Sequence, residues 1–132
     1  MREISDEFSI SKTIKREPHI NGRVFGLIKK AILPKDYILS LVFIGEKRSK
    51  TLNRIYRGKN YPTDILSFPL SKTSGEIFIN PHHAKIESRK FGRNPENFLL
   101  FLFIHGMCHL KGMTHGSRME TLERKYRARF GV

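Results

Sequence analysis

The chain has 132 residues, so we expect one domain that covers residues 1–132. Hydrophobic residues make up 39% and aromatic residues 11%, which is enough apolar material for a core and excludes a fully disordered chain. The net charge of +13 favours a polyanionic partner, although a basic surface that only keeps the protein soluble is the alternative.

Cysteine content and hydropathy indicate a reducing compartment. Cys108 is the one cysteine, so an intrachain disulfide is excluded. The first ten residues are charged and lack the apolar segment of a signal peptide. The longest apolar run, residues 98–104, is far shorter than the roughly 20 residues that cross a bilayer. We therefore expect a soluble, cytoplasmic protein without membrane contact.

Hydrophobic periodicity predicts strands and helices in mixed order. The expected strands cover residues 8–15, 39–44, 65–70 and 76–80, with a hairpin between the last two. The expected helices cover residues 22–33, 46–57, 81–91, 95–111 and 117–130. This order predicts an α+β protein with a mixed, mostly parallel sheet of about four strands packed with about five helices.

Several residues mark where these elements begin, end or lie. Asn21 is expected to cap a helix, and Pro69 places its strand at a sheet edge. Gly112 is expected to end a helix in the left-handed conformation. Ser117 and Glu120 have the spacing of a capping box, which predicts a capped start for the final helix.

The most informative segment is HGMCHLKGMTH, residues 105–115. His105 and His109 are four residues apart, so on a helix both imidazoles lie on one face. A chain reversal at Gly112 would return His115 as a third ligand to one divalent ion. Three protein ligands leave one coordination position open, which is typical of a catalytic site. The alternative is that these histidines are ordinary residues of an amphipathic helix.

The ion and the reaction follow from the same segment. Three imidazoles favour Zn²⁺, with Ni²⁺ and Cu²⁺ also compatible. Peptidases with a related helix carry H-E-x-x-H, whose Glu is the general base, whereas this chain has Gly106 at that position. The missing carboxylate argues against peptide hydrolysis, and the positive charge argues for a phosphodiester substrate.

Other residues give weaker signals. His82 and His83 follow a predicted strand and could contact nucleic acid or the site, but such pairs are more often solvated. Cys108 lies between the two histidines, yet it is offset around the helix from both, so we interpret it as a packing residue.

A second segment, residues 53–69, interleaves basic and aromatic residues. Arg57 and Lys59 flank Gly58 and precede Tyr61, which suits a single-stranded nucleic-acid path. The guanidinium of Arg57 offers a planar fork for phosphate. An ordinary polar loop is an equally good interpretation. Asp64, in the same segment, could stabilise the loop or orient a ligating histidine.

Taken together, these segments resemble the family of YbeY-type endoribonucleases. HGMCHLKGMTH is similar to the family signature H-G-x-x-H-L-x-G-x-x-H. YRGKNYPTDILSFP is similar to Y-R-x-K-x-x-P-T-D-V-L-S-F-P, and GEIFIN is similar to the family strand G-D-I-x-I. The resemblance covers nearly the whole chain.

The resemblance implies a metal-dependent endoribonuclease that is specific for single strands. Such enzymes act in maturation of ribosomal RNA, at the 3′ end of the small-subunit RNA, and in ribosome quality control. It implies a His-bearing helix related to that of metallopeptidases, with His105, His109 and His115 as metal ligands. It implies that Arg57 is catalytic, and Arg57 with Lys59 is expected to bind substrate. The ribosome or its small subunit is an expected partner.

The chain departs from the family pattern around the third histidine. Cys108, Met113 and Thr114 stand where the family usually has Leu, Tyr and Asp. Without that Asp, the carboxylate that orients a ligand is left open among three residues: Asp64, Glu76 and Glu120.

Two other functions stay open on the sequence. One is a metal-dependent hydrolase of peptides or small molecules. The other is a non-catalytic RNA-binding factor of ribosome assembly, in which the metal is structural.

Overall fold

The computed structural model describes residues 3–4, 7–15, 20–112 and 116–132. Its sheet has the order β1-β2-β3-β5-β4. The strands are β1 (Glu3–Ile4), β2 (Phe8–Lys12), β3 (Ile38–Phe43), β4 (Ile65–Ser71) and β5 (Ser74–Ile79). The helices are α1 (Gly22–Ile32), α2 (Glu46–Arg57), α3 (Pro81–Lys90), α4 (Pro95–Leu110) and α5 (Ser117–Phe130).

The sheet is mixed, as predicted. Its three central strands, β2, β3 and β5, run parallel, and the short β1 and the hairpin partner β4 run antiparallel at the two edges. The α+β class and five helices are confirmed. The two-residue β1 was not predicted, and β2 ends at Lys12 rather than at residue 15.

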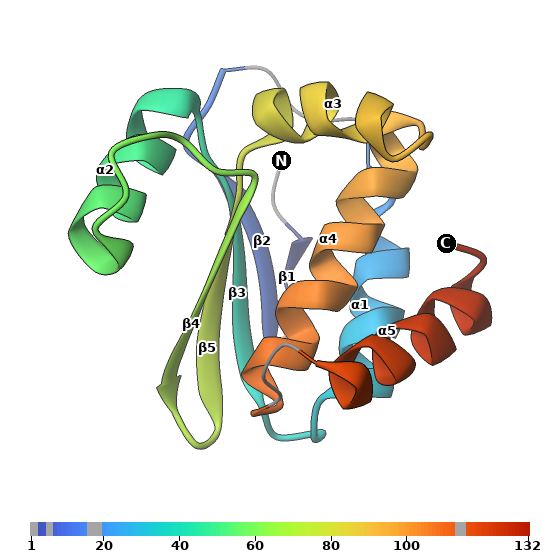
Figure 1. Cartoon of the computed structure of the whole chain (residues 1–132). Helices are drawn as coiled ribbons and strands as arrows, with labels where there is room; N and C mark the ends of the chain where they lie inside the picture. The colour runs from blue at the N-terminus through green and yellow to red at the C-terminus, as the bar shows by residue number, and fades with distance from the viewer. Residues whose placement is uncertain (1–2, 5–6, 16–19, 113–115) are drawn as a thin grey trace.

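The helices divide between the two faces of the sheet. Helices α1 and α4 lie side by side on one face, with α3 across the upper end of α4 and α5 across its lower end (Figure 1). Helix α2 lies apart from them on the other side of the strands (Figure 1). Its Tyr56 ring contacts Phe68, which in turn contacts Phe78, so these β4 and β5 side chains point away from α4.

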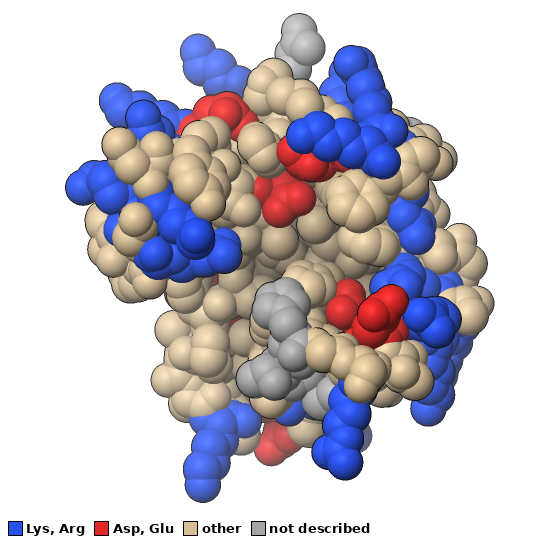
Figure 2. All heavy atoms as spheres, viewed as in Figure 1, with Lys and Arg blue, Asp and Glu red and all other residues tan. Residues whose placement is uncertain are grey.

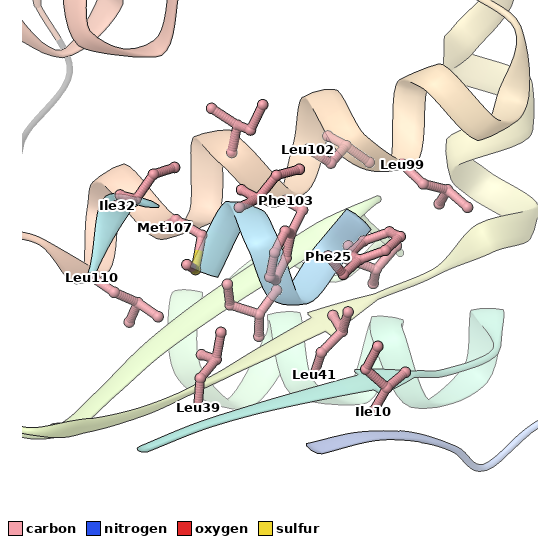
Figure 3. Packing of buried hydrophobic residues seen from close by; sticks show 14 of the residues in the cluster. Ile10, Phe25, Ile32, Leu39, Leu41, Leu99, Leu102, Phe103, Met107 and Leu110 are labelled. Atoms are coloured by element: carbon pink, nitrogen blue, oxygen red, sulfur yellow. The ribbon is translucent and has the colours of Figure 1, made fainter. Parts of the chain in front are cut away.

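Alternation along the strands explains the core. In β3, Leu39, Leu41 and Phe43 are buried on one face of the sheet. Leu39 and Leu41 point toward α1 and α4 (Figure 3), and the Phe43 ring lies 6.5 Å from Phe25 of α1. Above them, the rings of Phe25 from α1 and Phe103 from α4 lie 4.9 Å apart. Truncation of one such buried ring typically costs about 3–5 kcal/mol, so this contact fixes α4 firmly against α1.

Local signals at the helix ends have mixed outcomes. The side chain of Asn21 accepts a hydrogen bond from the Arg23 backbone N–H, so the predicted cap is confirmed. Gly112 has φ of +93°, as its predicted turn requires. The capping box was wrong. Gly116 is the N-cap of α5, and no side chain forms a capping hydrogen bond there. Ser117 is the first helical residue, one position too late to serve as the N-cap.

The position of β4 in the sheet agrees with the expectation from Pro69. Strand β4 is an edge strand, and the ladder is irregular between Pro69 and Ser71, where proline cannot donate a hydrogen bond. Within the described ranges, no helix is long and apolar enough to span a bilayer.

Helix α4 approaches β4 and β5 closely at Gly106. A Cβ atom there would lie 2.7 Å from the Ser67 hydroxyl, 3.0 Å from Ile65 and 3.1 Å from Ile77. These distances are too short for ordinary contact, so only glycine lets the helix axis come this near to the strands.

We expect Gly106→Ala to lower the free energy of unfolding by about 1–3 kcal/mol, because the added methyl group overpacks the contact with Ser67. Chemical denaturation measures this. The matched control is Gly26→Ala in α1, where the nearest atom outside the helix backbone is a Phe8 carbon at 3.9 Å. That variant should be neutral or more stable, since alanine favours helix. Equal stability of Gly106→Ala and the parent would contradict the close approach.

Candidate metal centre and its cleft

The histidine pair lies on a partly exposed face of α4. This helix is apolar around most of its circumference, because it is covered by the sheet, α1, α3 and α5. His105 and His109 are partly exposed exceptions, and their rings are 4.8 Å apart with an interplanar angle of 87°. The structure thus brings together the two predicted ligands on adjacent helical turns.

A carboxylate from α5 orients the first histidine. Glu123 Oε1 lies 2.9 Å from His105 Nδ1, and the Glu123 side chain is only 10% exposed. When Nδ1–H donates to this oxygen, Nε2 is the nitrogen left to bind an ion. Such a carboxylate–histidine pair is the usual support of a ligating imidazole, so the donor set fits a divalent metal.

The sequence did not identify Glu123 as this carboxylate. Of the three residues considered, Glu120 is exposed and forms a 3.1 Å ion pair with Arg124. Glu76 shares its sheet face with Phe78, opposite α4. Glu123 could have been found from its position, because it falls on the buried stripe of α5 that includes Met119 and Tyr126. A carboxylate on an otherwise apolar stripe needs a buried partner.

The third predicted ligand, His115, lies outside the described residues, as do Met113 and Thr114. Within the described part of the chain, no three side chains of the ligating types are grouped around one point. The assignment of His105, His109 and His115 therefore stays a prediction.

Cys108 does not contribute to this site. It is fully buried, and this burial raises the pKa of its thiol to about 12, with the nearby charge of Glu123 acting in the same direction. A protonated, enclosed thiol is neither a ligand nor a nucleophile, in agreement with the packing role expected for it.

His105 lines a cleft of about 380 Å³. Its walls come from the start of β4, the end of α3, and helices α4 and α5. The lining residues are Asp64, Ile65, Phe91, Phe98, Phe101, Leu102, His105, Glu120, Glu123 and Arg127. Figure 2 shows the charge pattern of this face, with Lys and Arg around its rim and acidic side chains nearer its middle.

Asp64 forms part of the wall opposite the histidine helix. Burial raises the pKa of its carboxyl group above the ordinary value; the neighbouring His83 opposes this, and Glu87 adds to it. The backbone carbonyl of Asp64 accepts a hydrogen bond from Asn80 N–H at 2.9 Å, which fixes the start of β4 beside the end of β5.

His83 connects α2 and α3 and is not among the residues that line the cleft. Its Nδ1 lies 3.6 Å from Glu46 of α2 and its Nε2 lies 3.7 Å from Glu87 of α3. Asn80 also donates to Glu46 at 2.7 Å. His82 is exposed. We interpret this polar cluster as a connection between α2 and α3.

The predicted phosphate-binding residues lie away from the cleft lining. Arg57 is the exposed last residue of α2, and Gly58 follows it with φ of +68°. Lys59 is exposed and lies 6.0 Å from the Tyr61 ring. Neither Arg57 nor Lys59 is among the described residues that line the cleft.

The loop that carries Lys59 is attached to α2. The Ser49 hydroxyl donates to the Thr63 carbonyl at 2.7 Å and accepts from its N–H at 2.9 Å. The buried Asn53 amide donates to the Tyr61 carbonyl at 2.8 Å. These bonds fix the second half of the loop, which leads directly to Asp64.

Comparison with known proteins identifies the family. The model of the endoribonuclease YbeY family matches residues 5–131. The chain belongs to this family. An endoribonuclease YbeY of Alkaliphilus metalliredigens is 30% identical, with 86% of this chain and 85% of that protein covered. One of Onion yellows phytoplasma is 34% identical, with 71% and 72% covered.

A solved structure shares the fold. The solution structure of a Thermotoga maritima protein has a TM-score of 0.61 and 28% identity, over 90% of this chain and 85% of that one. Membership of the endoribonuclease YbeY family confirms the predicted resemblance and the predicted class of enzyme, a hydrolase that cleaves RNA.

The raised pKa of Asp64 gives a pH-dependent prediction. An acid whose pKa is higher in the folded state favours folding when protonated, so its contribution to stability falls as pH rises above the ordinary value of 3.8. We therefore expect Asp64→Asn to be more stable than the parent at neutral pH, with a gain that shrinks toward pH 3. Urea denaturation at both pH values measures this. If Asp64→Asn gained the same stability at pH 3 as at neutral pH, Asp64 would not be a buried carboxylate that is ionised at neutral pH.

Proposed function

We propose that this chain is a metal-dependent endoribonuclease that cleaves single-stranded RNA in the maturation of ribosomal RNA. The activity is carried by one domain over residues 1–132, and the enzyme works in the cytoplasm. The observation that supports this most directly is the Glu123–His105 pair, which lines a cleft and lies beside His109, on a protein of +13 charge. The 3′ end of the small-subunit RNA and a ribosomal partner follow from the family resemblance.

The proposed metal site consists of His105, His109 and His115, with Zn²⁺ as the ion and Ni²⁺ as the second choice. The chemistry that such an ion supplies is that of a Lewis acid, which offsets negative charge on a phosphoryl group and makes water easier to deprotonate. Glu123 holds the His105 ring in one tautomer and orientation. Asp64 lies in the same cleft, where a carboxyl group can exchange a proton with substrate or solvent.

RNA reaches the cleft along a basic rim. Lys and Arg surround this face, so attraction of the phosphate backbone needs no sequence readout and weakens with salt (Figure 2). Arg57 and Lys59 extend this rim on the α2 side and are proposed to hold phosphates of the substrate, with Arg57 stabilising charge in the transition state. The fixed loop between Lys59 and Asp64 leads from this side to the cleft.

The packing at Gly106 argues against a peptidase. In H-E-x-x-H enzymes a Glu follows the first histidine. Here that position faces Ser67, Ile65 and Ile77 with no room for a side chain. The carboxylate that such enzymes use as a general base therefore has no equivalent at this place on the helix.

We expect His109→Ala to cleave a labelled single-stranded RNA more slowly than the parent by more than about 100-fold, since loss of a supporting residue alone costs about 10- to 100-fold. Affinity for the same RNA, measured by fluorescence anisotropy, should change little, because the basic rim is intact. Cleavage at the parental rate would exclude the metal mechanism. If the parent binds this RNA but does not cleave it, the chain is a binding factor and not a nuclease.

A second experiment tests the site without catalysis. Glu123→Gln should weaken Zn²⁺ binding by about 10-fold or more, because the neutral amide supports the His105 ring less strongly. Competition with a chromogenic chelator measures the affinity. Glu120→Gln is the matched control, since Glu120 lies one turn away and pairs only with Arg124 among the residues described. Equal Zn²⁺ affinity of both variants would place the ion elsewhere.

A further inference from the structure

The cleft continues beyond the histidines onto an aromatic wall. Phe91, at the end of α3, is 56% exposed, and its ring centroid lies 5.3 Å from Phe98 and 5.6 Å from Phe101. Phe98 is buried and stacks on Phe101 at 5.3 Å with an angle of 12°. The buried ring thus supports two rings that face the cleft.

Two arginines cover the same wall. The guanidinium carbon of Arg93 lies 4.5 Å from the Phe101 centroid, and that of Arg127 lies 5.1 Å from it. Arg93 is hydrogen-bonded to the Asn97 side chain, and no described carboxylate lies within ion-pair distance of it. Arg127 lies 3.9 Å from Glu123, the carboxylate that also holds His105.

This arrangement has an electrostatic cost in the free protein. Burial and the nearby charge of Arg127 both lower the pKa of Arg93, because two cations lie against one ring. Arg127 lines the cleft, and Arg93 lies beside it against the Phe101 ring. Two like charges this close repel each other, and a bound anion reduces that repulsion. Guanidinium groups also match the geometry of phosphate oxygens. The pair therefore favours a phosphate ligand at this end of the cleft.

Exposed rings with adjacent guanidinium groups bind nucleotides. Aromatic side chains stack on any base, and arginine adds cation–π and phosphate contacts. A base within a duplex is already stacked on both faces, so only an unpaired base can lie on such a wall. The connection through Glu123 places this wall next to the His105 ring.

We propose that the exposed ring of Phe91, supported by Phe98 and Phe101, stacks an unpaired base of RNA, and that Arg93 and Arg127 bind the phosphate beside it. This subsite deepens the proposed function and rests on it. It gives a physical reason for single-strand specificity, because the backbone can enter the histidine site only with a base stacked on the wall.

The test compares two oligonucleotides under metal-free conditions, with EDTA to prevent cleavage. One is a fluorescently labelled single-stranded RNA decamer, and the other is a decamer of the same backbone without bases. Phe91→Leu keeps an apolar side chain but removes the ring face. We expect its affinity for the RNA to fall by about 5-fold or more, with unchanged affinity for the abasic strand.

Two further variants complete the test. Arg93→Gln should weaken binding of both strands and reduce the dependence of affinity on salt concentration, since it removes a phosphate contact. Leu27→Ala in α1 is the control, because it also shortens a surface apolar side chain, 49% exposed, but does not line the cleft. Its affinities should equal those of the parent. Circular dichroism checks that each variant is folded.

The subsite would be overturned if Phe91→Leu bound the RNA as tightly as the parent does, or if its affinity fell equally for the RNA and for the abasic strand. If the parent still cleaves RNA in that case, the proposed function stands and only the stacking wall fails. If the parent neither binds nor cleaves RNA, both proposals fail together. A selective loss on the base-containing strand supports the subsite.

Discussion

The close contact of α4 with β4 and β5 is the constraint on which the site depends. Gly106 lets the helix backbone approach the strands, and Phe103 anchors the same helix against α1. From Leu102 to Leu110, every residue of the helix is buried except His105 and His109, which are partly exposed. Because a helix fixed in this way cannot rotate, the two imidazoles keep one direction, and a single carboxylate from α5 is enough to orient the first of them.

The charge distribution separates two tasks. The basic side chains lie around the rim, where they attract a polyanion over a long range (Figure 2). The acidic side chains of Asp64 and Glu123 lie inside the cleft, where they would repel phosphate unless a cation balanced them. These carboxylates are therefore compatible with the proposed divalent ion, whose charge would offset theirs. Arg127 adds positive charge in the same cleft, 3.9 Å from Glu123, and Arg93 lies beside it on the Phe101 ring.

Most of the fold could be predicted because its signals are local. Asparagine caps, proline at Pro69 and glycine at Gly112 mark boundaries within a few residues of sequence. The two-residue β1 has too short a pattern to detect, and the capping box failed because its spacing does not show where the first helical turn begins. Local spacing also predicted the His105–His109 pair, since both residues lie on one helix.

The rest of the site depends on contacts between distant elements. Glu123 lies 18 residues from His105, and no periodicity shows which of several carboxylates on separate elements will reach a ring. The aromatic wall combines residues from the end of α3, from α4 and from α5, so it exists only after these helices pack. The direction in which Arg57 points is similarly set by the packing of α2 on the far face of the sheet.

The attachment of the loop to α2 has an entropic consequence. Because Ser49 and Asn53 hold Thr63 and Tyr61, the backbone between Lys59 and Asp64 is already ordered before any ligand arrives. Ordering a flexible loop would subtract from the binding free energy, whereas a loop ordered during folding does not. The part of the loop from Tyr61 to Thr63 can therefore meet an incoming strand without this cost.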